Sequence, residues 1–191
     1  AVGNLRQYKN KDELNLDFII KELTNPIQNN NPTKNWNIAI EKVVVSNFNF
    51  SYDNFNHDVI MKGMDYNHIS IKDFHTNISK LKVRNDTISG FMNDMSAFEK
   101  CGFSLKNFKS HFSICNSQLN LHKTQLITNG SNVNTNLVFN FEHFSNFKNF
   151  IDSVSFKGEF ENSKLLLKDI SYFSSNLHQL KDTLTISGTI L

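Results

Sequence analysis

Hydrophobic and polar side chains alternate along most of this chain with a period of two. The stretch SNVNTNLVFNF, residues 131–141, shows it clearly, because Leu137, Phe139 and Phe141 share one parity and asparagines occupy most of the other. Successive side chains of a β-strand point to opposite faces. The pattern therefore predicts a strand with one apolar face and one wet face.

The same period begins at Ile38, in the segment IAIEKVVVSNFNFSY. This segment predicts a long strand, and the stretch DNFNHD, residues 53–58, ends it with turn-forming residues. The residues expected on its apolar face are Ile38, Ile40, Val44, Phe48, Phe50 and Tyr52.

Two short internal sequence repeats suggest that the strands are similar units. Residues 69–79, ISIKDFHTNIS, and 103–113, FSLKNFKSHFS, both place apolar residues at relative offsets 0, 2, 5 and 9, with a one-residue slip after a lysine. Such a slip exchanges the two faces unless a bulge absorbs it, so a repeated slip predicts a repeated bend. A second repeat, TISG, occurs at 87–90 and 185–188. Together they indicate an architecture that stacks similar strands.

Helical spacing of apolar residues interrupts the alternation in three places, residues 14–23, 141–151 and 169–180. The first predicts a short amphipathic helix, followed by a polar loop that reaches residue 37, and the other two predict caps over an edge or end of the sheet. We therefore expect an N-terminal helix and loop over residues 1–37 and a single β-segment over residues 38–191.

These helices are too short to cover the apolar face of the predicted sheet. Burying one Val, Leu, Ile or Phe side chain is worth about 1.5–3 kcal/mol, so a face with several such residues per strand must be covered. The sheet must fold onto itself, pair with another chain or enclose something apolar. We expect a mostly β protein with a few short helices, in which an antiparallel sheet curls into a groove.

Charge and composition exclude some function classes. Of 191 residues, Lys and Arg number 20 and Asp and Glu 18, a net charge of +2, and no basic stripe is present, so nucleic acid is not an expected partner. No apolar run approaches the roughly 18 residues that a membrane-spanning helix needs. The chain has 18 Phe against a single Trp, and such aromatic enrichment suits β-structure.

No catalytic or metal-binding motif is present. The sequence lacks GxSxG, HExxH, a Walker loop and CxxC, and its seven histidines lack metal-ligand spacing and are expected to face solvent. Aspartates fall at strand ends, where turns favour them. We therefore expect no enzyme activity, no catalytic residues, no metal and no cofactor. Cys101 and Cys115 are expected to be two free thiols, and a bridge between them stays open as the alternative.

The order of segments resembles a known family. The most telling pieces are TISG followed by FEKCGF, residues 98–103, and KDISYF, residues 168–173, followed by LTISG. Between them lie alternating strands such as LNLHKTQLITNGSNVNTNLVFNF. Over residues 14–190 the chain resembles the TamB proteins of the Bacteroidetes, members of the wider AsmA-like group.

The resemblance implies a fold, a location and partners. Such proteins are long, are anchored in the inner membrane by an N-terminal helix, and cross the periplasm towards an outer-membrane barrel partner of the Omp85 type. Their curled sheet, often called a β-taco, has an apolar trough thought to carry phospholipid acyl chains between membranes, and a role in outer-membrane biogenesis is also implied. This chain lacks the membrane helix and the region that meets the barrel, so it is expected to be a periplasmic fragment.

The candidate groove-lining residues are the apolar-parity ones. For each of them, plain sheet core is the alternative role. They are Ile69, Ile71, Phe74, Ile78, Phe103, Leu105, Phe108, Phe112, Val133, Leu137, Phe139, Phe141, Val154, Phe156 and Phe160.

Two other readings of the whole chain stay open. One is a scaffold or chaperone-like segment that helps outer-membrane protein assembly by adding strands at an open sheet edge. The other is a closed β-sandwich with a dry core. Exposed terminal strands also make an end-to-end homodimer a reasonable expectation.

Overall fold

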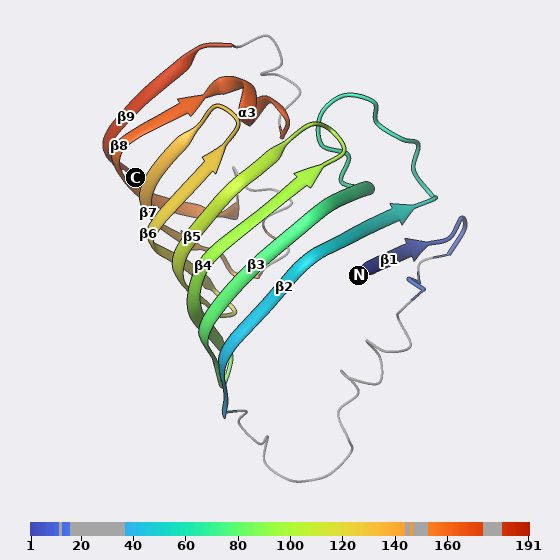
Figure 1. Ribbon diagram of the computed structural model, residues 1–191, viewed down its shortest axis with the longest axis horizontal. Helices are drawn as coiled ribbons and strands as arrows, with labels where there is room; N and C mark the ends of the chain where they lie inside the picture. The colour runs from blue at the N-terminus through green and yellow to red at the C-terminus, as the bar shows by residue number, and fades with distance from the viewer. Residues whose placement is uncertain (12, 16–36, 144–145, 147–152, 174–180) are drawn as a thin grey trace.

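The computed structural model describes residues 1–11, 13–15, 37–143, 146, 153–173 and 181–191, and these form one nine-stranded sheet. The strands lie side by side in chain order, and the sheet curls without closing into a barrel (Figure 1). The predicted curled, mostly β fold is therefore confirmed. The strands are β1 Val2–Gln7, β2 Asn37–Asn54, β3 His68–Arg84, β4 Thr87–Glu99, β5 Ser104–Ile114, β6 Gln118–Thr128, β7 Asn132–Asn140, β8 Ser155–Leu166 and β9 Thr183–Ile190.

All neighbouring strands from β2 to β9 are antiparallel, but β1 runs parallel to β2 and makes the sheet mixed. Val2 lies opposite Asn49, and the terminal amino group of Ala1 donates to the carbonyl oxygen of Asn47 at 3.1 Å. The sequence pattern missed β1, because six residues with only two large apolar side chains are too few to show a period. The helix predicted over residues 14–23 falls mostly on residues 16–36, outside the described part of the chain.

Helix α3, Leu167–Ser171, follows β8 directly and is the only helix of more than one turn among the described residues. It overlaps the predicted helical segment 169–180 over residues 169–171 and starts two residues before it, and residues 174–180 lie outside the described part of the chain. Most of the predicted helix at 141–151 is also outside it. Within the described residues no helix has the length and apolar character to cross a bilayer.

Each long strand bends near its middle, at a β-bulge. Four non-glycine residues sit there in the left-handed region, with φ between 42° and 52°: Asn47, Asp73, Lys123 and Asn162. The pairing register shifts between Lys72 and His75, and again between Leu105 and Asn107. Both predicted slips, after Lys72 and Lys106, are thus confirmed as bulges, which bend a strand and increase its twist.

The polar groups freed by these bulges are bonded by side chains of the neighbouring strand. The backbone N–H of Asp73 donates to Oδ1 of Asn49 at 3.0 Å, and that of Lys123 donates to Oδ1 of Asn136 at 2.8 Å. These bonds satisfy donors that the interrupted ladder leaves without a partner. Abundant asparagine therefore has a structural role on the wet face of the sheet.

A row of small buried hydroxyl residues crosses the sheet at the bends, and we call this row the crease. Its members bond backbone or one another: Ser110 Oγ lies 2.8 Å from Thr124 Oγ1, and Thr135 Oγ1 donates to the carbonyl of Glu159 at 2.8 Å. A small side chain fits the inside of a sharp bend where a larger one would clash. The crease consists of Thr76, Ser110, Thr124, Thr135 and Ser163.

One predicted facing in β2 is wrong. Val44 was expected on the apolar face, but it lies opposite Asn77 and is 52% exposed, whereas Val43 lies opposite Ile78. The neighbouring strand has a left-handed residue beside this stretch, Lys80, with φ of 51°. Such a residue breaks the alternation that the parity argument assumed.

Candidate functional site

The apolar face carries a continuous row of directly paired side chains on one side of the crease. Each strand from β2 to β8 contributes one member, and each member is the register partner of the next. Neighbouring strands lie about 4.8 Å apart, so six spacings extend this row over roughly 29 Å. The row is Ile38, Val83, Ile88, Ile114, Leu119, Phe139 and Phe156.

A second row lies closer to the crease. Phe112 pairs with Leu121, which pairs with Leu137, which pairs with Gly158. A Cβ atom on Gly158 would lie 2.7 Å from the ring of Phe160 and 2.9 Å from that of Phe156, so glycine lets both rings lie over this position. Phe139 and Phe156 stack with ring centroids 5.5 Å apart. Together these two rows form one apolar wall.

Beyond the crease the face stays apolar and forms a second wall. Phe108 pairs with Leu126, and Leu126 pairs with Val133. Side chains from β4, β5, β6 and β8 border a single pocket on this side, so the sheet curls towards its apolar face. The two walls and the crease between them define a trough, whose axis runs across the strands from β2 to β8.

The described residues do not seal this trough. Among them only one hydrophobic side chain is buried, that of Phe141, which is 6% exposed. The wall residues Ile38 and Ile88 are 38% and 41% exposed. The interior of a closed β-sandwich consists of fully buried apolar residues on every strand. The burial of the described residues therefore differs from that expected for a closed sandwich.

The structure places twelve of the predicted lining residues on strands β3, β5, β7 and β8, and three, Phe103, Phe141 and Val154, next to strand ends. Pairing joins those of β7 and β8 directly, whereas those of β3 pair mainly with residues of β2, such as Phe74 with Phe48. Strand β3 is linked to β5 only through β4, and β5 to β7 only through β6, and the prediction named no residue of β4 or β6, such as Leu121. In β6 the alternation of Leu119 and Leu121 was a usable signal, but Lys123 interrupts it with a bulge.

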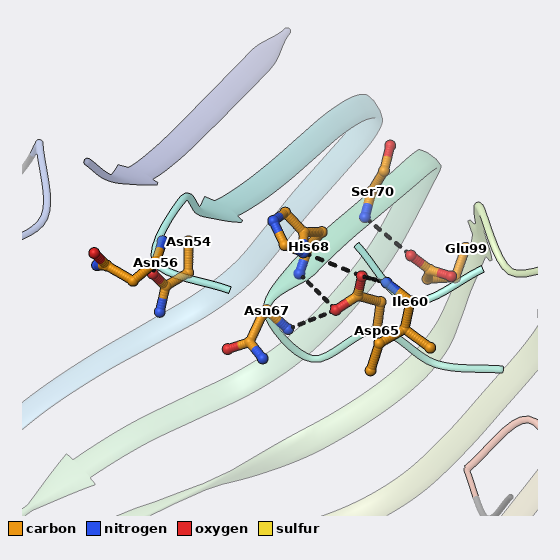
Figure 2. A network of polar contacts seen from close by, with 8 residues as sticks. All are labelled: Asn54, Asn56, Ile60, Asp65, Asn67, His68, Ser70 and Glu99. Atoms are coloured by element: carbon orange, nitrogen blue, oxygen red, sulfur yellow. Dashed lines mark hydrogen bonds and ion pairs between the residues drawn. The ribbon is translucent and has the colours of Figure 1, made fainter. Parts of the chain in front are cut away.

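The most elaborate polar cluster lies at one rim of the sheet, in the loop between β2 and β3 (Figure 2). Asp65 is 1% exposed and accepts hydrogen bonds from the backbone N–H groups of Ile60 and Asn67, at 2.8 and 3.1 Å. The Nδ1 atom of His68 lies 3.1 Å from the same carboxylate. Burial acts to raise the pKa of Asp65, but these hydrogen bonds and the charge of His68 outweigh it, so the pKa is lowered. His68 is buried at 4% exposure, so its expected solvent exposure is wrong.

A second buried carboxylate, Glu99, holds the neighbouring turn between β4 and β5. Its Oε1 accepts from the backbone of Ser70 at 2.9 Å, a bond also drawn in Figure 2, and its Oε2 accepts from the backbone of Cys101 at 2.6 Å. Asp65 is thus engaged with backbone donors of its own loop, and Glu99 with one donor of its own turn and one of strand β3. Each of these carboxylates therefore organises a turn at the rim of the sheet.

The cysteines and the potential metal ligands are the remaining candidates for reactive side chains in the described part of the chain. Cys101 and Cys115 are both free thiols. Burial, with a contribution from Glu99, raises the pKa of Cys101 to about 11, so at neutral pH it is a protonated thiol and a poor nucleophile. The described residues contain no group of three or more His, Cys, Asp or Glu that could hold a metal ion.

Comparison of the chain with protein-family models, with curated proteins and with solved structures gave no match. The geometry of the trough is therefore the main basis for a functional assignment.

Proposed function

We propose that this chain is a segment of a periplasmic bridge that carries phospholipid between the inner and outer membranes along an apolar trough. The supporting observation is the row of paired apolar residues from Ile38 to Phe156, which is continuous over seven strands and of which Ile38 and Ile88 are 38% and 41% exposed. Lipid tails are the physiological ligands that need a long apolar surface without specific polar contacts. The resemblance to the TamB proteins points the same way.

The dimensions suit an acyl tail. The hydrocarbon core of a bilayer is about 30 Å thick, so the tails of one leaflet span about 15 Å, roughly half of the 29 Å row. One tail can lie on the wall without leaving it, and a second can follow. Its charged headgroup stays in water at the open side of the trough.

The crease does not interrupt this apolar path. Its hydroxyl groups are bonded within the protein, as in Ser163, which is 0% exposed and donates to the carbonyl of Asn134 at 2.9 Å. A hydroxyl that already has a partner does not need water, so a hydrocarbon chain can pass over it at little cost. Movement along the trough breaks no covalent bond, which is consistent with a protein that needs no catalytic residue.

A photo-crosslinking experiment tests the proposal. Benzoylphenylalanine replaces Phe139 on the trough wall or Val138, the next residue of β7, which pairs with Asn120 and Lys157 on the opposite face. The protein is equilibrated with vesicles of phosphatidylethanolamine and phosphatidylglycerol, irradiated and analysed by mass spectrometry. We expect phospholipid adducts from position 139 at least tenfold above those from position 138. Equal yields, or none from either position, would contradict the proposal.

A second candidate function is a scaffold that assists assembly of outer-membrane β-barrel proteins by strand addition. The observation that favours it is the edge strand β9, which pairs with β8 on one side and with no described strand on the other. An edge of this kind can accept an extended segment through main-chain hydrogen bonds. The same edge is where an end-to-end homodimer of the chain is expected to form.

The two functions respond differently to two changes. Under the scaffold function, binding of an extended barrel-strand peptide survives Phe139→Asp and is lost when a proline is placed in β9. Under the trough function, with benzoylphenylalanine placed at Leu119, the register partner of Phe139, Phe139→Asp abolishes the lipid adducts and the proline in β9 leaves them unchanged. Fluorescence anisotropy of a labelled peptide and mass spectrometry of lipid adducts separate the two results.

A further inference from the structure

Helix α3 is fixed over the second wall of the trough by a buried carboxylate. Asp169 lies within the helix and is 7% exposed. The hydroxyls of Thr128 and Ser131, which flank the turn between β6 and β7, both donate to its Oδ2 atom at 2.5 Å. Ser131 Oγ in turn accepts from the backbone N–H of Leu166 at 3.0 Å. These bonds hold the start of α3 against the rim of the sheet.

The segment after α3 is held from the other side by aromatic contacts. The ring of Phe103, in the turn between β4 and β5, lies edge-on to those of Phe173 and Tyr172, with centroids 4.9 and 5.9 Å apart. The backbone N–H of Met64 donates to the carbonyl of Tyr172 at 2.6 Å. Through Tyr172 the chain after β8 therefore reaches the loop between β2 and β3.

Between the segment 167–173 and the second wall of the trough lies a pocket of about 390 Å³. Its only polar side chains are Thr128, Ser131 and Asp169, and these are bonded to one another. The remaining lining residues are Met95, Phe103, Leu105, Phe108, Leu126, Leu165, Ile170 and Phe173.

The volume and the apolar lining of this pocket favour a small hydrocarbon group as its ligand. An apolar cavity of about 150 Å³ stays free of water and takes up benzene, and ligand pockets usually measure about 300–1,000 Å³. A charged or hydrogen-bonding ligand group would lose its bound water in this pocket, and the polar side chains that could replace that water are already bonded to one another. A saturated hydrocarbon chain loses nothing of this kind and gains contact with eight apolar side chains.

We propose that this pocket binds the methyl end of a single linear alkyl chain. The inference rests on the proposed function, because the chain reaches the pocket from the trough. The two are continuous: Phe108 and Leu126 line the pocket and also pair across the second wall, where Leu126 meets Val133. The pocket gives one tail a defined end point, whereas the open first wall offers only a surface along which it can slide.

The test uses dodecanoic acid that carries a diazirine at its methyl end. The protein is irradiated with this probe, and the labelled residues are located by peptide mass spectrometry. We expect labels on pocket residues such as Leu105 and Leu126 that saturate with probe concentration. Filling the pocket with Leu126→Trp or Leu165→Trp should reduce pocket labelling at least tenfold, provided that circular dichroism and the melting temperature show a folded variant.

The matched control is Gln125→Trp, a tryptophan at the position next to Leu126 on the same strand, where the side chain points to the opposite face of the sheet and the register partners are Lys109 and Asn134. It should leave pocket labelling within twofold of the wild type. Pocket labelling that does not saturate, or that survives both filling variants, would overturn the inference.

The outcomes separate this inference from the proposed function. Labels on the row around Ile114 and Phe139 without labels in the pocket would refute the pocket site and leave the trough intact. Saturable labels in the pocket alone would keep the hydrocarbon site and count against transport along the trough. If neither wall is labelled, the pocket is refuted as an alkyl site. The same holds if the dimer fraction shows that a second copy of the chain occupies the pocket and displaces the probe.

Discussion

Phe139 and Phe141 provide the sharpest test of whether the trough is open. Both lie near the end of β7 and share one parity, but Phe141 is buried at 6% exposure, whereas Phe139 is only partly buried and stacks on Phe156. We compare Phe139→Ala with Phe141→Ala. If the apolar face is an open wall, the two changes should have clearly different effects on the free energy of unfolding.

The expected magnitudes follow from what each ring contacts. Replacing a fully buried Phe by Ala costs about 3–5 kcal/mol, part of which comes from the cavity that remains, and this range is expected for Phe141. Phe139 leaves no closed cavity, so it loses about 0.5–1.5 kcal/mol from the stacked pair and about half of a transfer free energy of 1.5–3 kcal/mol. The sum is about 1–3 kcal/mol, with about 2 kcal/mol as the central value.

Urea unfolding followed by circular dichroism measures both free energies, and calorimetry measures the melting temperatures. For a chain of this size about 1 kcal/mol shifts the melting temperature by roughly 2–4 °C, so we expect decreases of about 4–8 °C for Phe139→Ala and about 8–16 °C for Phe141→Ala. If the two variants lose equal stability, near 4 kcal/mol, the first wall is a closed core. The reasoning behind the trough would then be refuted.

Three further predictions concern the crease and the rim. Ser163→Ala removes both hydrogen bonds between Ser163 Oγ and the backbone of Asn134. We therefore expect the free energy of unfolding, measured with urea, to fall by about 1–3 kcal/mol. A decrease below about 0.5 kcal/mol would show that this crease hydroxyl is dispensable. Because the pKa of Cys101 is raised to about 11, alkylation of its thiol by iodoacetamide should be slow at pH 8 and should become roughly tenfold faster per pH unit up to about pH 11. The alkylation should also be faster in Glu99→Gln, because Glu99 contributes to the raised pKa. An alkylation rate that does not depend on pH would contradict the raised pKa. The pKa of Asp65 is lowered in the folded state, so its stabilising contribution is present above the unfolded value of about 3.9 and is lost as the pH falls through the folded value. Asp65→Asn should therefore lower stability at pH 7 and flatten the decrease below pH 4, and an unchanged acid profile would exclude this role.

Local alternation was enough to predict much of the sheet. The parity of residues 131–141 placed Leu137 and Phe139 on one face, and the structure pairs both with residues of the same apolar wall. The slips after Lys72 and Lys106 marked real bulges, because one extra residue disturbs the period whether or not the neighbouring strand is known. For the same reason the predicted apolar-face residues of β5 and β7, such as Phe112 and Leu137, share the register partner Leu121.

Other features depended on contacts between distant segments. Strand β1 exists because β2 offers it a parallel edge, and Val44 turns outward because its neighbouring strand is interrupted at Lys80. His68 is buried because Asp65 and the loop fold around it, which its position in the sequence did not indicate.

The sequence alone determined that the strands have an apolar and a wet face, because the direction of a side chain follows from a backbone period of two that acts within each strand. Only the tertiary structure decided which strands are neighbours, how the bulges align into the crease, and that α3 covers a pocket on the second wall. Those features arise from hydrogen bonds and packing between residues far apart in the chain, such as Thr128 with Asp169, and no local pattern records such pairings.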